Sequence, residues 1–127
     1  MKILLKTIPH KEQRYPTVGD WLWTTEGLEI RVSLMNNWRY ESLVVFHELC
    51  EVLICQHMNV SQLQVDEFDI MFEKERELGQ HSQDAEPGDD PRAPYRLAHF
   101  IATNCERILA VALGVDWGEY CAAVESL

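Results

Sequence analysis

The sequence has few features of a membrane protein, a secreted disulfide scaffold or a zinc knuckle. No stretch of its 127 residues approaches the roughly 20 consecutive apolar residues that a membrane-spanning helix requires. Residues 1–10 lack the longer apolar region and the small-residue cleavage site of a secretory signal, which predicts a cytoplasmic protein. The four cysteines form no CxxC pair and lie mostly among apolar residues, so we expect free, buried thiols.

Positive charge is also scarce, because 11 Lys and Arg residues stand against 21 Asp and Glu residues, a formal net charge of −10. We therefore expect no nucleic acid and no membrane as partners, since both require Lys and Arg to neutralise phosphate. The charge favours solubility, cationic partners and metal ions. One exception stays open, because a small acidic protein can imitate nucleic acid and occupy a DNA-binding partner's groove. An ordinary solvated surface also explains the composition.

The length and the hydrophobic content of 46% suit one compact domain over residues 1–127 and are too small for two ordinary domains. A long polar segment, residues 79–94, interrupts its second half. This segment is rich in Pro, Gly and Asp and has no periodicity. Because connections this long are uncommon inside a compact domain, it is either a mobile linker or a loop arranged over a site.

The first third of the chain has the pattern of a small β-sheet. Residues 2–8 are a short apolar run, and residues 20–25 are rich in aromatic residues and threonine, so both favour strands. A turn at Glu26 and Gly27 follows, and residues 28–34 then alternate between apolar and polar. This alternation predicts a strand covered on one side only and paired in an antiparallel hairpin with residues 20–25.

The rest of the chain has the signals of three to four helices. Asn36 and Asn37 supply N-cap chemistry for the first helix, and Gly79 and Gly114 stop later ones. The predicted helices cover residues 38–58, residues from 61 or 65 to 78, residues 95–113 with Pro94 before them, and a short last helix that Asp116 caps and that runs through residue 125. The fold class is therefore α+β, with a small N-terminal antiparallel sheet or hairpin packed on a bundle of three to four helices.

Residues 44–54, VVFHELCEVLI, place one histidine and two glutamates in an apolar helix. At about 100° per residue, His47, Glu48 and Glu51 fall within an arc of about 100° and share one face. Apolar side chains fill most of the remaining circumference, which predicts a buried helix whose acidic face points into the protein or a cleft. Because an unpaired buried carboxylate costs several kcal/mol, these glutamates need a cation, a hydrogen-bond network or a metal ion.

The helix expected later in the chain offers a matching polar stripe. His99 and Glu106 are seven residues apart and nearly eclipse each other, with Thr103 between them. Ala102 and Ala110 lie beside this stripe, and such small residues let a neighbouring helix approach closely. The two stripes therefore predict that these helices face each other.

A metal ion is one partner that both stripes could share. His47 and Glu51, four residues apart, can place an imidazole nitrogen and a carboxylate oxygen on one ion, and His99 could complete three ligands. Two imidazoles and a carboxylate with an open position suit Zn²⁺, Fe²⁺ or Mn²⁺. We expect a divalent metal ion as cofactor, with zinc as the first choice.

A purely structural network explains the same residues. Each histidine could form a hydrogen bond with the glutamate on its own helix, and Arg96 or Arg107 could neutralise the carboxylates. Asp66 and Asp69 are further acidic candidates, although at the start of a helix such residues more often cap it or interact with its dipole. Whether Glu106, Asp66 or Asp69 joins the site stays open.

The segment HELCE, residues 47–51, resembles the helix motif HExxH of zincin metallopeptidases, in which a strand precedes the motif-bearing helix. The resemblance covers about residues 20–58 and implies a zincin-like fold, with His47 as a zinc ligand and Glu48 as the general base. This sequence departs from the motif at Glu51, which gives a degenerate HExxE in which the glutamate would be the second ligand. The assignment of His99 as third ligand is an inference from the stripes and not part of the family motif.

Three functions follow from these observations. The first is a metal-dependent hydrolase, in which a metal-activated water attacks a peptide or amide bond and Glu48 takes its proton. The second is a non-catalytic acidic module on a zincin-like frame, which binds a protein partner through the hairpin, the long loop or tryptophans 21, 23 and 38, unless these tryptophans belong to the core. The third is a Mg²⁺- or Mn²⁺-dependent nucleotide pyrophosphohydrolase, although that class has more carboxylates at helical spacing.

Overall fold

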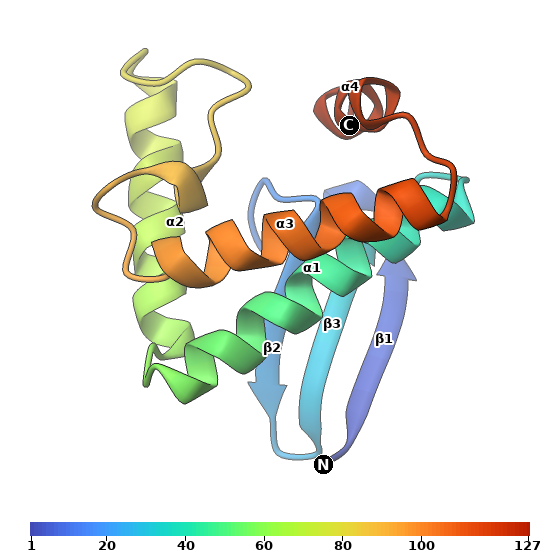
Figure 1. Cartoon of the computed structure of the whole chain (residues 1–127). Coiled ribbons are helices and arrows are strands. Elements are labelled where there is room, and N and C mark those ends of the chain that lie inside the picture. Colours follow the sequence, from blue (N-terminus) through green and yellow to red (C-terminus); the bar gives the residue numbers. More distant parts are fainter.

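The computed structural model describes residues 1–127 and has a small sheet followed by four α-helices (Figure 1). The elements are β1 (Ile3–Ile8), the 3₁₀ turn η1 (His10–Glu12), β2 (Gly19–Thr24), β3 (Gly27–Ser33), α1 (Trp38–His57), α2 (Gln62–Glu77), the 3₁₀ turn η2 (Pro87–Asp89), α3 (Arg96–Ala112) and α4 (Trp117–Glu125). The predicted α+β class is confirmed, and the predicted elements begin and end within a few residues of the observed ones.

The sheet is mixed, and not antiparallel throughout as expected. β2 and β3 form the predicted antiparallel hairpin, with Trp21 opposite Ile30. β1 pairs in parallel with the other side of β3, so the strand order is β1-β3-β2. The backbones of Gly27 and Lys2 lie close together where β1 pairs with β3. A β-carbon at Gly27, where φ is 134°, would collide with the carbonyl oxygen of Lys2. Glycine is the residue that allows both the dihedral angle and the contact.

The alternation predicted for the third strand holds as far as Val32. Leu28, Ile30 and Val32 are at most 2% exposed and form the inner face of β3. The strand ends at Ser33, and Leu34 is exposed because the chain has left the sheet. The inner face of β3 is therefore the surface on which α1 packs.

Helix α1 lies between the sheet and α3 (Figure 1). It contacts β2 and β3 on one side and α3 on the other, which explains why its sequence is apolar around most of its circumference. Its predicted N-cap is Asn37, whose side chain accepts hydrogen bonds from the backbone N–H groups of Arg39 and Tyr40. On α3, Ala98 and Ala102 are fully buried, so the small residues of that helix allow close contact with α1.

Helices α2 and α4 pack around α1 and α3. α2 contributes Val65, Phe68 and Phe72 to the core, and Tyr120 of α4 packs on Tyr40 of α1 with ring centroids 5.4 Å apart. The loop over residues 79–94 contains the 3₁₀ turn η2. No single helix is long and apolar enough to cross a membrane, and α3 and α4 reach that length and hydropathy only as a pair bent by 120°.

The tryptophans and cysteines follow the predictions in part. Trp21 is buried in the core, whereas Trp23 and Trp38 are exposed, so the core interpretation holds only for the first. All four cysteines are free thiols, as expected. Cys55 is buried and the other three are half-buried.

Candidate metal centre

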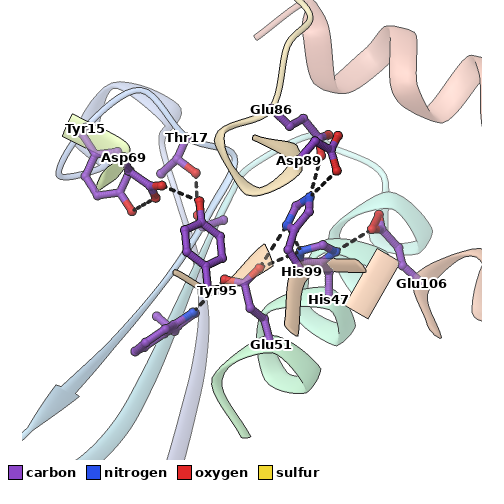
Figure 2. A network of polar contacts seen from close by, with 12 residues as sticks. Tyr15, Thr17, His47, Glu51, Asp69, Glu86, Asp89, Tyr95, His99 and Glu106 are labelled. Atoms are coloured by element: carbon purple, nitrogen blue, oxygen red, sulfur yellow. Dashed lines mark hydrogen bonds and ion pairs between the residues drawn. The ribbon is translucent and has the colours of Figure 1, made fainter. Parts of the chain in front are cut away.

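Three side chains from two helices meet in a buried cluster. His47 and Glu51 lie one turn apart on α1, and His99 comes from α3 (Figure 2). Their exposed fractions are 8%, 5% and 8%, so all three are withdrawn from bulk water. His47 Nε2 lies 3.2 Å from both Glu51 Oε2 and His99 Nδ1, and His99 Nδ1 lies 3.1 Å from Glu51 Oε2. The three side chains expected as ligands therefore lie together and could hold a metal ion.

The spacing of these three atoms matches a metal coordination sphere. With metal–ligand bonds of about 2.0–2.1 Å, neighbouring ligand atoms lie about 3.3 Å apart in a tetrahedral centre and about 2.9 Å apart in an octahedral one. The observed separations of 3.1–3.2 Å fall between these values. Small adjustments of the side chains would place all three atoms on one ion.

Each histidine has one ring nitrogen that faces into the cluster, the inner nitrogen, and one that faces away from it, the outer nitrogen. The hydrogen bond of the outer nitrogen determines whether the inner nitrogen carries a proton or a lone pair. His47 Nδ1 lies 2.9 Å from Glu106 Oε1, and His99 Nε2 lies 2.9 Å from Glu86 Oε2. Because an ionised carboxylate only accepts, each outer nitrogen must carry the proton and donate it. In a neutral imidazole the inner nitrogen then has a lone pair, and both lone pairs point toward the same space. Carboxylate–histidine pairs of this kind orient metal ligands in proteins.

Glu51 and Glu106 are held in place by further hydrogen bonds. The buried Trp21 indole donates from Nε1 to Glu51 Oε1 over 3.1 Å, which leaves Oε2 directed at the histidines. The Tyr120 hydroxyl donates to Glu106 Oε2 over 2.7 Å. The ligand carboxylate and the carboxylate behind His47 are therefore both fixed by donors from other elements.

Protons are the alternative to a metal ion in this cluster. Burial alone lowers the pKa of both histidines, but the neighbouring carboxylates outweigh it, so the pKa of His47 lies well above its ordinary value and that of His99 is raised to about 10. Burial raises the pKa of Glu51, but the hydrogen bonds and charges of the two histidines outweigh burial and lower this pKa to about 2. Two imidazolium rings would nevertheless direct N–H groups at each other over 3.2 Å. One divalent ion satisfies all three groups without that repulsion.

The structural network expected as an alternative differs from the observed one. The His47–Glu51 contact within α1 is present, but Glu106 pairs with His47 across the helices and not with His99 on its own helix. Neither arginine of α3 forms a salt bridge with these carboxylates. Arg107 instead stacks over the Trp117 ring at 4.6 Å. The cluster therefore contains no neutralising arginine.

Glu48 lies beside the cluster and is not part of its network. Its side chain is half-buried and forms no hydrogen bond or ion pair, and it lines the same cavity of about 430 Å³ as His47, Glu51 and His99. Burial, and next the charge of Glu51, raises the pKa of Glu48 well above its ordinary value. A free carboxyl group with a raised pKa is suited to take up and release a proton.

The two further acidic candidates lie on α2 outside the cluster. Asp66 accepts hydrogen bonds from the Arg14 guanidinium, and Asp69 accepts from the hydroxyls of Tyr15, over 3.0 Å, and Tyr95. Neither caps the helix, because Ser61 forms the capping box of α2. The expectation that Asp66 or Asp69 caps the helix was therefore wrong. Both carboxylates instead accept hydrogen bonds from residues far away in the sequence.

Several residues that complete the site were not identified from the sequence. Glu86 comes from the polar loop, and Trp21 and Tyr120 come from β2 and α4. None of them has a periodic companion near the HELCE segment, so no local pattern indicates them. The loop lies over the cluster, where Glu86 contacts His99, which is the placement that the second interpretation of this loop expects (Figure 2).

No protein-family model, curated protein or solved structure matches this chain. The zincin resemblance therefore stays a prediction that depends on residues 20–58 alone. The structure adds that a strand, β3, precedes the motif-bearing helix α1.

Proposed function

We propose that this protein is a metal-dependent hydrolase whose centre is the His47, Glu51 and His99 cluster. The observation that carries the proposal is the convergence of two imidazole lone pairs and one carboxylate oxygen within 3.2 Å, buried between two helices. The second support is Glu48, a carboxyl group without a partner that lines the same cavity. Ligands and a free acid–base group in one cavity are the requirements of metal-assisted hydrolysis.

The donor set limits the ion that this centre would hold. Two imidazole nitrogens and one carboxylate oxygen suit Zn²⁺, Fe²⁺ or Mn²⁺, and we propose zinc because the three atoms leave a further position free, as in catalytic zinc sites. Such an ion lowers the pKa of a water molecule that it binds and polarises a carbonyl oxygen. Glu106 and Trp21 keep His47 and Glu51 in orientation through the hydrogen bonds described above.

Glu48 is the residue that we propose as the general base. It follows His47 directly on α1 and lines the cavity, and it has no competing hydrogen bond. The carboxylate takes a proton from the attacking water, and the carboxylic acid returns it to the leaving group. Proton transfer by a positioned side chain contributes about 10²–10⁴-fold to a rate.

The substrate that we propose is a peptide or another amide. This choice depends on the HExxE resemblance to zincin metallopeptidases, in which the glutamate beside the first histidine has the role proposed for Glu48. The cavity supports it against a nucleotide substrate, because nine carboxylates line the cavity and Arg76 is the only arginine or lysine there. Phosphate groups would meet mainly like charge at this surface.

Metal content per chain is the first test. We expect close to one equivalent of a transition metal in protein purified without a metal-binding tag, and a loss of that metal in the Glu51→Ala and His99→Ala variants. His57→Ala is the matched control, because His57 is exposed at the end of α1 and forms no hydrogen bond or ion pair. Folded protein that contains no metal and takes up no added Zn²⁺ or Mn²⁺ would overturn the proposal and favour a protein-binding module.

Turnover is the second test, made with a set of fluorogenic peptides. Glu48→Gln should keep the metal stoichiometry of the parent protein and lower kcat by about 10²-fold or more. Glu119→Gln, a change of the same type at an exposed position on α4, should leave kcat unchanged. Equal rates for the parent and the Glu48→Gln variant would exclude Glu48 as the base.

A further inference from the structure

The loop over residues 79–94 touches the candidate metal centre at His99. Glu86 Oε2 lies 2.9 Å from His99 Nε2, and Asp89 Oδ1 lies 3.5 Å from the same atom (Figure 2). Gly88 is buried against the imidazole, and a β-carbon added there would collide with the ring. The loop therefore holds His99 both through its ring nitrogen and through its ring face.

Helix α2 holds the loop in this position. The Arg76 guanidinium donates to the backbone carbonyl oxygens of Ser82, Gln83 and Ala85, over 2.6, 3.0 and 2.6 Å. The His81 ring stacks on the Phe72 ring with centroids 3.8 Å apart. These contacts form a continuous connection from α2 through the loop to His99 on α3.

A second set of ion pairs fastens the far end of the loop to the same helix. Arg92 binds the carboxylate of Glu75 on α2 over 2.8 and 3.1 Å, and His81 Nε2 lies 2.8 Å from that carboxylate. These groups sit at the protein surface, where ion pairs are weak and easily exchanged with water. Besides the Arg76 hydrogen bonds, the loop is therefore fixed to α2 by ion pairs that solvent can reach.

We propose that the loop is the device that keeps His99 in the metal-ligating state, with Glu86 as the positioning residue. This inference rests on the proposed metal centre. While Glu86 accepts from Nε2, the proton stays on that nitrogen and Nδ1 presents its lone pair to the ion. The side chain of Glu86 is 58% exposed, so little of its own surface has to be uncovered when it leaves His99. Once it leaves, the imidazole can change tautomer or rotate, and the ion is released.

The dissociation rate of a bound ion tests this role directly. The protein is loaded with Co²⁺, and loss of the ion to excess chelator is followed by the visible absorption of the Co²⁺ centre. Glu86→Ala should weaken Co²⁺ binding and speed its release about 10–100-fold, the usual effect of losing a carboxylate behind a ligating histidine. Glu86→Gln should restore most of the affinity, because its amide oxygen still accepts from Nε2.

Two further variants separate positioning from a general loss of stability. Asp84→Ala removes an exposed carboxylate from the same loop that makes no contact with His99, and it should release Co²⁺ at the parent rate. Gly88→Ala should shift the Co²⁺ spectrum, because the added methyl group displaces the ring. A merely structural role for the loop would change the melting temperature in these variants and leave the spectrum unaltered.

The outcomes distinguish this inference from the proposed function. If Glu86→Ala, Glu86→Gln and Asp84→Ala all release Co²⁺ at the parent rate, the loop does not position His99, although the metal centre stands. If the parent protein binds no Co²⁺ at all, the metal centre and the role of the loop are both overturned. Faster release in Glu86→Ala alone, with a changed spectrum, supports the positioning role.

Discussion

Gly19, at the start of β2, lies against Glu48 of α1, and this contact allows a test of Glu48 as the proposed base. A β-carbon at Gly19 would lie 2.6 Å from Glu48 Oε1 and 2.7 Å from Val44 Cγ1. The carboxylate is the movable end of a flexible side chain, so we expect Gly19→Ala to displace it. Because Val44 belongs to the buried core, the same change should also lower the stability of the fold, which thermal unfolding measures. kcat should fall at least about 10-fold, since general bases act only within hydrogen-bond reach, while metal content stays unchanged.

Gly118→Ala on α4 is the matched control for this change. A β-carbon there would meet only Asp116 Oδ1, at 3.4 Å, and would cause no displacement in the site. Steady-state kinetics and metal analysis of both variants give the comparison. Loss of metal in Gly19→Ala would show that the glycine shapes the ligand cluster and not the base alone.

Asp69 makes the stability of the protein depend on pH. Burial raises the pKa of Asp69 from 3.8 to about 7, although the hydroxyls of Tyr95 and Tyr15 lower it in part. A pKa raised by folding contributes stability that is complete below 3.8 and is lost as the pH rises through about 7. Between about pH 5 and pH 8 the parent should therefore lose about 2–3 kcal/mol of unfolding free energy relative to Asp69→Asn.

Chemical denaturation of both proteins at a series of pH values checks this expectation. Metal-free protein is the right sample, because a cation beside Glu51 would lower the pKa of Asp69. The histidines of the cluster titrate in both proteins, so their effect cancels in the difference. Parallel curves of unfolding free energy against pH would show that Asp69 has an ordinary pKa in the folded state.

The residues of the candidate site divide into those that a helical period indicates and those that it does not. His47, Glu51 and His99 could be predicted because each sits in a polar stripe on an otherwise apolar helix. Glu86 and Trp21 could not, because their partners lie 13 and 30 residues away and depend on how a loop and a strand are placed. Such contacts depend on tertiary packing, so the periodicity of a local sequence does not predict them.

At the level of elements, the same distinction separates the helices from the sheet. The helices were predictable because their caps and stops are local, as with Asn37 before α1 and the capping box at Ser61. The hairpin of β2 and β3 was predictable from its short turn and alternation. The parallel pairing of β1 was not, because the chain between β1 and β2 must pass to the far side of β3, and nothing in the strand itself sets that path.

The contact between α1 and α3 depends on small residues, and one of them allows a direct test. Ala102 is fully buried on α3, close in the chain to His99 and Glu106. Ala102→Leu adds a side chain to a packed interface, which costs about 1–3 kcal/mol and pushes the helices apart. Because the three ligands come from both helices, we expect metal affinity to fall at least about 10-fold, as for other disturbed ligand shells.

Ala112→Leu is the control for this substitution, since Ala112 is exposed at the end of the same helix. It should leave both stability and metal affinity close to those of the parent. Thermal unfolding with and without Zn²⁺ measures both quantities, because a ligand that binds only the folded state raises its stability. Unchanged zinc stabilisation in Ala102→Leu would mean that the ligands do not depend on the spacing of the two helices.

At the scale of the whole molecule, the net charge is −10, and many of the acidic residues lie around one cavity. Nine carboxylates line the cavity around the candidate centre, against one arginine, Arg76. That arginine is already engaged, since it donates to three loop carbonyls and to Glu73. A cavity lined by one sign of charge focuses the field and raises the local concentration of ions of the opposite sign.

This field predicts which substrates the proposed hydrolase prefers. Two fluorogenic peptides that differ only in lysine or glutamate beside the scissile bond should differ in kcat/KM by about 10-fold or more at low salt, with the lysine peptide faster. The difference should shrink as ionic strength rises from about 0.01 M to about 1 M, because the Debye length falls from about 30 Å to about 3 Å. Glu125→Gln removes one charge from the cavity lining without touching a proposed ligand, and it should narrow the difference. Equal kcat/KM for both peptides at low salt would show that substrate choice is set by contacts at the scissile bond and not by the charge of the cavity.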